Sequence, residues 1–341
     1  MVKRIDIEEF LRLQREDNLP VIDVRSPSEF AHGHIPNAKN VYLFNDEERR
    51  VVGTIYKEDG REAAILKGLE YVGSRMANIL KEVDKISNNN VILMHCFRGG
   101  MRSESVAWLC SNYKYDVYVL DKGYKSYRRY VLESFNNKKY KINLVTGRTG
   151  SKKTLILNRL KELEYNVIDL EGIAKHKGSA FGWINEGEQP SQEQFENNLC
   201  YELCKYSNGS YLWVEDESLL IGKRAIPRGF FDNMKKPENI IYLNVPIEER
   251  AKYITDTYGK YSVNDLKESI IKIKKRLGDE RMREALSLLE ENKIYECVLV
   301  LLYYYDKAYR LSIREEDKII NVECGSLTID DIVSVISEIK S

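Results

Sequence analysis

The chain has 341 residues, 43% of them hydrophobic, and its 53 basic side chains balance 53 acidic ones. This composition excludes a disordered chain and a uniformly basic protein that coats nucleic acid, so any RNA contact must come from a local basic patch. The first residues, MVKRIDIEEF, lack the apolar core of a signal peptide, and the apolar run 297–305 is too short to span a membrane. Six cysteines without a CxxC pair favour neither disulfides nor a structural metal. We therefore expect a cytoplasmic protein with reduced thiols and no membrane contact.

Strand and helix patterns alternate in residues 1–135, which predicts a first domain with a parallel sheet. The predicted strands are 19–24, 91–96 and 117–123, and a helix is predicted over 103–113. Another helix begins after Ser26, because Ser26 can cap it, Pro27 suits its first position and Glu29 can close a capping box.

A polar, charged stretch, NNKKYK at 136–141, predicts a linker, and the same pattern of strand and helix then resumes in a second domain, 142–341. Its predicted strands are 142–147, 165–172, 211–218 and 239–246. From about residue 246 onward the pattern is helical and highly charged. The sequence thus predicts an α/β protein of two domains with a helical C-terminal region.

The stretch HCFRGGMRS places Cys96 between a buried strand and a helix. Backbone N–H groups and the positive helix end in such a loop bind an anion and lower the pKa of a cysteine. Gly99 and Gly100 let the backbone turn, and Arg98 and Arg102 add charge. These neighbours favour a nucleophile over a structural thiol.

Cysteine phosphatases and rhodanese-type sulfurtransferases share this loop design. The stretch IDVRSPSEFAHGHIPNA (22–38) resembles the signature of the rhodanese/Cdc25-phosphatase fold. The spacing from Cys96 to Arg102 has the phosphatase-like length, which suits a tetrahedral, phosphate-sized anion. The first domain alone therefore leaves sulfur transfer and phosphate chemistry open.

The stretch GRTGSKKT follows a predicted strand and opens a predicted helix, as a phosphate-binding P-loop requires. Its backbone would cradle phosphates, Lys153 would neutralise their charge and Thr154 would reach a magnesium ion. Lys152 stands where glycine is usual, and we expect it to be tolerated there if its backbone is helical. The predicted phosphate-binding residues are Gly147, Thr149, Gly150, Ser151, Lys152, Lys153 and Thr154. Glu215 and Asp216, at the end of an apolar strand, are the magnesium candidates.

Several stretches together resemble the tRNA 2-selenouridine synthase family, over nearly the whole chain. They are CFRGGMRS, DKGYKSYRR (121–129), LEGIAKHKGSAFG (170–182), QPSQEQFEN (189–197) and VEDESLLIGKRAIP (214–227). This sequence departs from the family pattern at Lys152, at Lys177, where arginine is expected, and at Leu219–Leu220, where a more polar pair is expected.

The resemblance implies a rhodanese-like domain joined to a P-loop NTPase-like domain. It implies a transferase that replaces the sulfur of wobble 2-thiouridine in the tRNA anticodon by selenium. Geranyl diphosphate would first alkylate the sulfur, and selenophosphate, from a supply enzyme, would then donate selenium. The P-loop would hold the diphosphate, and Cys96 could carry selenium as a perselenide.

RNA contacts are predicted at basic and aromatic side chains near these motifs. The candidates for tRNA or diphosphate contacts are His176, Lys177, Ser179, Lys223, Arg224, Arg228, Tyr124 and Tyr127. A further basic group, Lys272, Lys274, Lys275 and Arg276, lies in the helical region. The alternative interpretations are a cysteine phosphatase or sulfurtransferase fused to a P-loop kinase, and a noncatalytic RNA-binding protein that uses a nucleotide as a switch.

Overall fold

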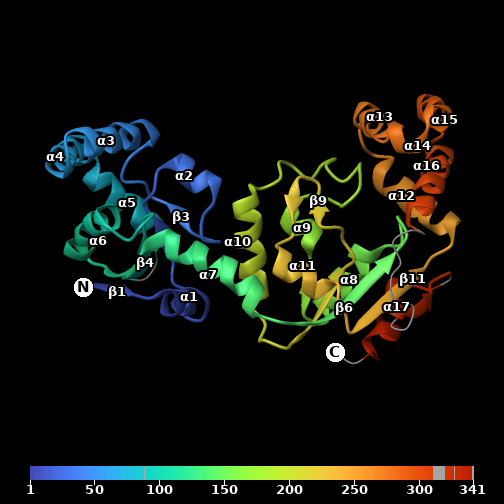
Figure 1. Cartoon of the computed structure of the whole chain (residues 1–341), viewed down its shortest axis with the longest axis horizontal. Coiled ribbons are helices and arrows are strands. Elements are labelled where there is room, and N and C mark those ends of the chain that lie inside the picture. Colours follow the sequence, from blue (N-terminus) through green and yellow to red (C-terminus); the bar gives the residue numbers. More distant parts are fainter. Residues whose placement is uncertain (88–89, 310–318, 326, 340–341) are drawn as a thin grey trace. The chain divides into compact units, whose positions relative to one another are not determined.

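The computed structural model describes residues 1–87, 90–309, 319–325 and 327–339 (Figure 1). They form two compact units, which we describe separately. Unit 1 comprises residues 1–134 and 196–201, and unit 2 comprises residues 135–195 and 202–341. The predicted α/β class with parallel sheets is confirmed.

Unit 1 is built on a five-stranded sheet in the order β1-β5-β4-β2-β3, in which every pair of neighbours is parallel. The strands are β1 (Val2–Ile5), β2 (Val21–Asp23), β3 (Lys39–Asn40), β4 (Val91–His95) and β5 (Asp116–Leu120). The three strands predicted from apolar runs are β2, β4 and β5. The half-exposed edge strands β1 and β3 carry no apolar run that could have predicted them.

Helices surround this sheet, and its hydrophobic core includes Ile22, Ile92 and Val106. The helices are α1 (Ile7–Arg15), α2 (Pro27–His32), α3 (Asp46–Glu58), α4 (Arg61–Val72), α5 (Met76–Ile86), α6 (Met101–Tyr113) and α7 (Gly123–Asn137). Helix α2 begins as predicted: Pro27 is its first residue, and the backbone N–H of Ser26 donates to Glu29 Oε2 at 3.0 Å.

Unit 2 holds a second parallel sheet, in the order β12-β11-β6-β8-β7. Its strands are β6 (Lys141–Gly147), β7 (Val167–Ile168), β8 (Tyr211–Glu215), β11 (Asn239–Asn244) and β12 (Ile319–Glu323). Two short strands, β9 (Leu220–Ile221) and β10 (Arg224–Ala225), form an antiparallel pair. Strand β12 was not predicted, because it lies in the tail whose pattern is mostly helical.

The helices of unit 2 cover this sheet and extend beyond it. They are α8 (Lys153–Glu162), α9 (Leu170–Ala174), α10 (Gln192–Leu203), α11 (Arg228–Met234), α12 (Ile247–Tyr258), α13 (Val263–Lys272), α14 (Lys274–Leu277), α15 (Asp279–Glu290), α16 (Ile294–Tyr309) and α17 (Ile329–Ser337). Residues 196–201 of α10 belong to unit 1. The predicted helical region has its own core, which includes Leu266, Leu289 and Leu301.

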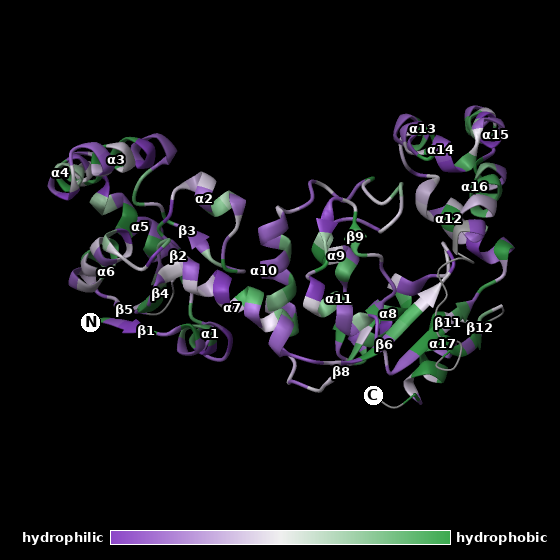
Figure 2. Cartoon of the chain, viewed as in Figure 1, coloured by the Kyte–Doolittle hydropathy of each residue, from purple (hydrophilic) through white to green (hydrophobic). Residues whose placement is uncertain are grey.

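The hydropathy of the two sheets agrees with their burial. Strand β6 is fully buried from Ile142 to Gly147, and Figure 2 shows it as largely hydrophobic. Helix α7 ends at Asn137 and β6 begins at Lys141, so residues 138–140 alone separate these two elements. Within the described residues, no helix combines the length and apolar character needed to cross a membrane.

Candidate functional site

The cysteine loop, residues 96–102, joins the carboxyl end of β4 to the first turn of α6. Gly99 has φ +64°, and a Cβ there would lie 2.8 Å from the carbonyl oxygen of Leu120 and from the backbone nitrogen of Lys122. Glycine is therefore required at this position, both by its left-handed backbone and by the close approach of another segment.

Cys96 is almost fully buried and is surrounded by hydrogen-bond donors. The Ser103 hydroxyl lies 3.2 Å from Cys96 Sγ. Burial raises the pKa of the Cys96 thiol, but donors from Ser103 and the backbone, together with the charge of Arg102, outweigh it and lower the pKa overall. The loop thus favours a thiolate, as a nucleophile requires.

The two predicted arginines of the loop occupy different environments. Arg102 is held in a bidentate ion pair, with Nη1 at 2.6 Å from Glu29 Oε2 and Nη2 at 3.2 Å from Glu29 Oε1. Burial raises the pKa of Glu29, but the hydrogen bond and charge of Arg102, together with the Ser26 backbone donor and the charge of Arg49, outweigh this rise, so its pKa is lowered. The Arg98 side chain is exposed, and its guanidinium lies 5.9 Å from the ring centroid of Phe97.

A buried polar network lies behind the cysteine loop. Arg25 pairs with Asp23, with Arg25 Nη2 at 2.6 Å from Asp23 Oδ2, and both side chains are buried. His95 lies 3.7 Å from the same carboxylate, and burial lowers its pKa to about 4. Asp23 and Arg25, from the signature stretch 22–38, and His95 therefore pack beneath the cysteine loop and do not face solvent.

The network contradicts one prediction about RNA contact. Tyr124 and Tyr127 are both buried, and the guanidinium of Arg25 lies 3.8 Å from the centroid of the Tyr124 ring. Asn197 donates to the Tyr124 hydroxyl at 2.8 Å. Because their rings are already packed inside unit 1, the prediction that these tyrosines stack on a base was wrong.

The P-loop, residues 147–154, joins β6 to α8, as the sequence predicted. Lys153 Nζ lies 3.2 Å from the carbonyl oxygen of Gly147, and Gly150 has φ +86°. The buried Arg250 of α12 donates to the carbonyl oxygen of Thr149 at 3.2 Å and pairs with Asp306. Arg250, to which no sequence motif pointed, therefore fixes the loop from a helix distant in the chain.

Lys152 adopts the left-handed conformation, with φ 62° and ψ 23°. The condition under which we expected a lysine to be tolerated, a helical backbone, is therefore not met. In this conformation a Cβ lies too close to the following carbonyl oxygen, which explains why glycine is usual here.

Three carboxylates gather beside the P-loop, and we call them the acid cluster: Glu171, Glu215 and Glu217 offer oxygen atoms within 4.8 Å of one another. Thr154 Oγ1 donates to Glu171 Oε2 at 3.3 Å. Burial raises the pKa of each carboxyl, and the charge of Glu171 adds to the rise at Glu215 and Glu217; the pKa of Glu217 reaches about 8.

The acid cluster corrects the predicted pair of acids. Glu215 belongs to it, but Asp216 accepts a hydrogen bond from Thr146 Oγ1 at 2.8 Å and is not one of the three. Glu217 belongs to the same acidic stretch and follows Glu215 by two residues. Because side chains alternate between the two faces of a strand, this spacing would have predicted that Glu217, rather than Asp216, lies beside Glu215. Glu171 comes from α9, and only the family-like stretch 170–182 drew attention to that segment.

A cavity of about 910 Å³, which we call the basic cavity, lies in unit 2. It brings together predicted residues from three separate stretches: His176, Ser179, Lys223, Arg224, Lys272, Lys275 and Arg276. The basic cavity also adjoins the acid cluster, because Gly178 lines it and a Cβ on Gly178 would lie 2.7 Å from Glu217 Oε1.

Three predicted basic side chains do not line the basic cavity. Lys177 Nζ pairs with Glu186 Oε1 at 2.8 Å, and Arg228 Nε pairs with Asp232 Oδ1 at 3.0 Å. Lys274 likewise pairs with Asp279. Their charges are engaged within the chain, so these three side chains are poorer candidates for an RNA phosphate. The same holds for Lys272, which lines the cavity but pairs with Glu268 Oε1 at 2.8 Å.

Comparisons with known proteins agree with the two units. A family model for the tRNA 2-selenouridine synthase AAA domain matches residues 140–336, and a model for the rhodanese-like domain matches residues 6–130. A tRNA 2-selenouridine synthase from Shewanella frigidimarina is 33% identical over 94% of this chain and 95% of its own length. One from Hydrogenovibrio crunogenus is 36% identical over 80% of each chain.

Among solved structures, Saccharomyces cerevisiae Ygr203w, a homolog of single-domain rhodanese and Cdc25 phosphatase catalytic domain, is 18% identical. It covers 39% of this chain and 83% of its own, with a TM-score of 0.25. The sequence relatives are the stronger evidence for the family, since the match to the Shewanella frigidimarina protein covers 94% of this chain. From the P-loop unit, the cysteine-loop unit and relatives that match nearly end to end, we conclude that this chain belongs to the tRNA 2-selenouridine synthase family.

Proposed function

We propose that this protein converts wobble 2-thiouridine of tRNA into 2-selenouridine in two steps, one at each anion loop. In unit 2, geranyl diphosphate alkylates the sulfur. In unit 1, selenium from selenophosphate replaces the geranylated sulfur. The observation that carries the proposal is the presence, in one chain of this family, of a thiolate-favouring loop at Cys96 and a P-loop at Lys153.

In the first step, the sulfur of 2-thiouridine attacks the first carbon of the geranyl group. A carbon–sulfur bond forms, and the carbon–oxygen bond breaks with its electron pair going to the diphosphate. The proton on N3 of the base is released to solvent. Lys153 and the N-terminus of α8 stabilise the charge that grows on the leaving diphosphate.

The acid cluster fits a magnesium ion in this step. Magnesium prefers oxygen ligands, and Glu215 Oε2 is a buried carboxylate oxygen without a hydrogen-bond partner. Glu171, Glu215 and Glu217 would hold the ion next to the Thr154 hydroxyl. A bound ion would supply charge neutralisation for the diphosphate.

In the second step, the phosphatase-like length of the cysteine loop favours attack on phosphorus. The Cys96 thiolate attacks the phosphorus of selenophosphate, a sulfur–phosphorus bond forms, and hydroselenide leaves with the electron pair of the phosphorus–selenium bond. Hydroselenide then attacks C2 of the base, and geranylthiolate leaves with the electron pair of the carbon–sulfur bond. The selenide proton passes to N3, which regains the proton lost in the first step, and geranylthiolate takes a proton from solvent. Water finally releases phosphate from Cys96. Selenide is a good leaving group, so the step needs no separate general acid.

This route predicts that ³²P-labelled selenophosphate labels Cys96 transiently. The label should be trapped on the Cys96 peptide by rapid acid quench and should be absent in Cys96→Ala. If selenium rather than phosphorus is found on Cys96, the thiolate attacks selenium instead, and the phosphoryl route is wrong.

The basic cavity supports tRNA binding beside the P-loop. Its lysine and arginine side chains suit phosphate oxygens, and its wall at Gly178 touches the acid cluster. A nucleoside bound there would lie next to the diphosphate.

The test is a nucleoside digest of tRNA, read by mass, after reaction with geranyl diphosphate and selenophosphate. Lys153→Ala should stop S-geranylation and hence selenium insertion, whereas Cys96→Ala should stop selenium insertion and accumulate S-geranyl-2-thiouridine. tRNA that is already geranylated should rescue Lys153→Ala but not Cys96→Ala.

Matched controls are Lys161→Ala, which removes an exposed lysine from the same helix as Lys153, and Cys110→Ala, which removes a buried thiol from α6. Both should retain both steps. Selenouridine formation by Cys96→Ala at the wild-type rate would contradict the proposal, as would rapid tRNA-stimulated ATP hydrolysis that geranyl diphosphate does not affect.

A further inference from the structure

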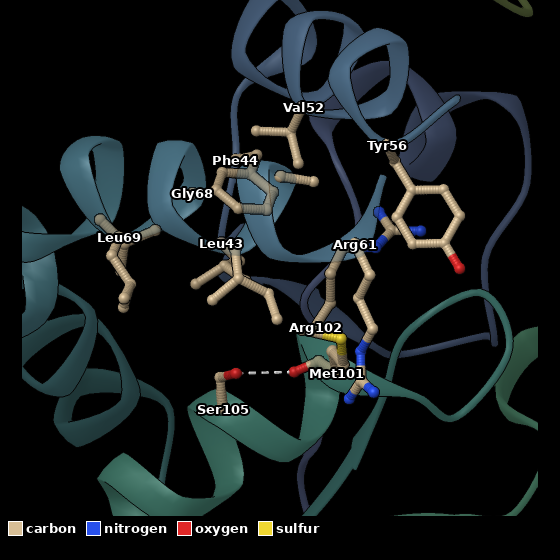
Figure 3. Close-up of a pocket in the computed structure, with 13 residues that line it drawn as sticks. Leu43, Phe44, Val52, Tyr56, Arg61, Gly68, Leu69, Met101, Arg102 and Ser105 are labelled. Carbon is tan, nitrogen blue, oxygen red and sulfur yellow. Dashed lines mark hydrogen bonds between the residues drawn. The ribbon is translucent and has the colours of Figure 1, made fainter. Parts of the chain in front are cut away.

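An apolar cavity of about 200 Å³, which we call the α4 pocket, lies in unit 1 between α3, α4 and the first turn of α6 (Figure 3). Its walls are almost entirely hydrocarbon and include Phe44, Val52, Ala64, Ile65 and Leu69. Several large apolar side chains around it are exposed: Tyr56 at 58%, Leu69 at 62% and Met101 at 41%. Exposed apolar side chains gathered around a cavity are typical of a binding site.

The α4 pocket adjoins the cysteine loop through the first turn of α6. Met101, Arg102 and Ser105 line the pocket, as Figure 3 shows, while Ser103 on the same turn contacts Cys96 Sγ. One turn of helix rises only about 5.4 Å, which is less than the length of an extended eight-carbon chain. A nucleoside whose C2 lies beside the cysteine loop is therefore within reach of the pocket for such a chain.

The lining of the pocket favours a hydrocarbon over a polar ligand. A nucleobase would need hydrogen-bond partners in a buried site. The Ser105 hydroxyl already donates to the carbonyl oxygen of Met101 at 2.8 Å, and Arg102 is paired with Glu29. The other two polar side chains of the lining, Tyr56 and Arg61, belong to exposed residues. An apolar cavity of about 150 Å³ admits a six-carbon ring, so this one has room for much of a short isoprenoid chain.

We propose that the α4 pocket holds the geranyl group of the S-geranylated wobble nucleoside while selenium replaces sulfur at C2. This inference rests on the S-geranyl intermediate of the proposed function. Anchoring the chain places C2 beside the cysteine loop. When the C2–sulfur bond breaks and its electron pair passes to sulfur, the geranylthiolate leaves C2 with its chain still in the pocket. The geranyl group is then a recognition element as well as part of the leaving group.

The proposal is tested with synthetic anticodon stem-loops that carry S-geranyl- or S-methyl-2-thiouridine, so that the P-loop step is bypassed. Binding to the full-length protein and single-turnover selenium exchange are both measured. We expect the geranyl substrate to bind and react about tenfold or more better than the methyl substrate, since a few buried carbons suffice for such discrimination.

The key variant is Ile65→Trp, which fills the pocket from α4. It should abolish the preference for the geranyl substrate and leave the methyl substrate unaffected. The matched control is Leu66→Trp, which adds the same ring at an adjacent position that is 66% exposed and does not line the pocket. A second variant, Leu69→Ser, removes an apolar side chain from an exposed position, so the fold should tolerate it, and it should weaken the preference.

Two outcomes would overturn the proposal. One is equal binding of the geranyl and methyl substrates by the wild-type protein. The other is a preference for the geranyl substrate that persists in Ile65→Trp. In that case the geranyl group is recognised elsewhere, such as in the P-loop unit, and the α4 pocket has another occupant, such as an apolar protein segment. Failure of the proposed function is a separate result, namely no S-geranyl product from 2-thiouridine tRNA and geranyl diphosphate, and the binding measurement does not depend on it.

Discussion

At the scale of single residues, the chemistry of unit 1 depends on how Cys96 is solvated. The thiol is removed from water, yet it gains the Ser103 hydroxyl at 3.2 Å and the nearby charge of Arg102. Glu29 connects this site to α2, because the same carboxylate accepts from the Ser26 backbone and from Arg102. A single glutamate thus caps a helix and orients the arginine of the cysteine loop.

We predict that Cys96 reacts with iodoacetamide as a thiol of lowered pKa. The thiolate is the reactive form, so the rate rises with pH through the pKa, and its midpoint should lie below that of an unperturbed cysteine. Ser103→Ala removes a donor to the sulfur and should move the midpoint to higher pH. The measurement is alkylation of the Cys96 peptide, followed by mass spectrometry as a function of pH.

Cys110 is the internal control for this experiment. Burial and the charge of Asp84 raise its pKa to about 12, so it should remain unreactive while Cys96 is alkylated. A rate profile that is unchanged in Ser103→Ala would show that the hydroxyl does not stabilise the thiolate.

The left-handed backbone of Lys152 leads to a stability prediction. Replacing Lys152 by glycine should raise the free energy of unfolding by about 0.5–1 kcal/mol, because relief of the Cβ clash exceeds the loss from a more flexible unfolded chain. Urea denaturation measures the change. Lys152→Ala is the control, since it removes the charge but keeps the Cβ; an equal gain in that variant would attribute the effect to charge instead.

At the scale of secondary-structure elements, both sites use the same arrangement. A buried parallel strand ends in a glycine-containing loop, and a helix begins where an anion would lie: β4 leads to α6, and β6 leads to α8. The positive helix end and free backbone N–H groups favour an anion in both loops. The acid cluster adds the end of β8 and the first turn of α9 to the second site.

We predict that the acid cluster destabilises unit 2 unless a cation is bound. In EDTA, Glu215→Gln should raise the free energy of unfolding by about 2 kcal/mol, because it removes the buried one of three neighbouring carboxylates. The glutamine oxygen can still accept from the Glu171 backbone N–H, which donates to Glu215 Oε1 at 3.0 Å.

Thermal unfolding with and without magnesium measures this effect. Magnesium should raise the melting temperature of the wild type in the presence of diphosphate and should have little effect on Glu215→Gln. Asp216→Asn is the matched control, since Asp216 lies next to the cluster but outside it. A magnesium response that survives in Glu215→Gln would place the ion elsewhere.

At the scale of the whole molecule, a chain with zero net charge places five lysine and arginine side chains around one cavity, together with Glu188 and Glu268. We predict that tRNA binding weakens steeply with salt despite this neutrality, because lysine and arginine contacts release counterions from phosphates. Arg276→Ala should reduce the slope of log K against log salt by about one if Arg276 contacts one phosphate.

Equilibrium binding at several salt concentrations gives that slope. Lys260→Ala is the control, since Lys260 is exposed in the same helical region but does not line the basic cavity. Affinity that does not vary with salt would argue against a phosphate-dominated interface, and equal effects of the two substitutions would argue against the basic cavity as its location.

The features that the sequence determined are those encoded within short stretches. Apolar runs of strand length, followed by glycines and a helical pattern, predicted β4–α6 and β6–α8, and the capping residues Ser26, Pro27 and Glu29 predicted the start of α2. These signals are local, because strand and helix periodicity and loop chemistry depend on neighbouring residues. The family resemblance, confirmed by the comparisons, followed from the same stretches.

Only the tertiary structure decided which distant residues meet. Three contacts join residues that lie far apart in the chain. Arg102 pairs with Glu29, Glu171 meets Glu215 and Glu217, and the Tyr124 ring is buried against Arg25. Strand β12 depends in the same way on hydrogen bonds to β11, a partner about 80 residues earlier. The α4 pocket likewise forms only when α3 and α4 pack over the first turn of α6. Contacts of this kind arise from packing and pairing between elements, and no window of neighbouring residues contains both partners.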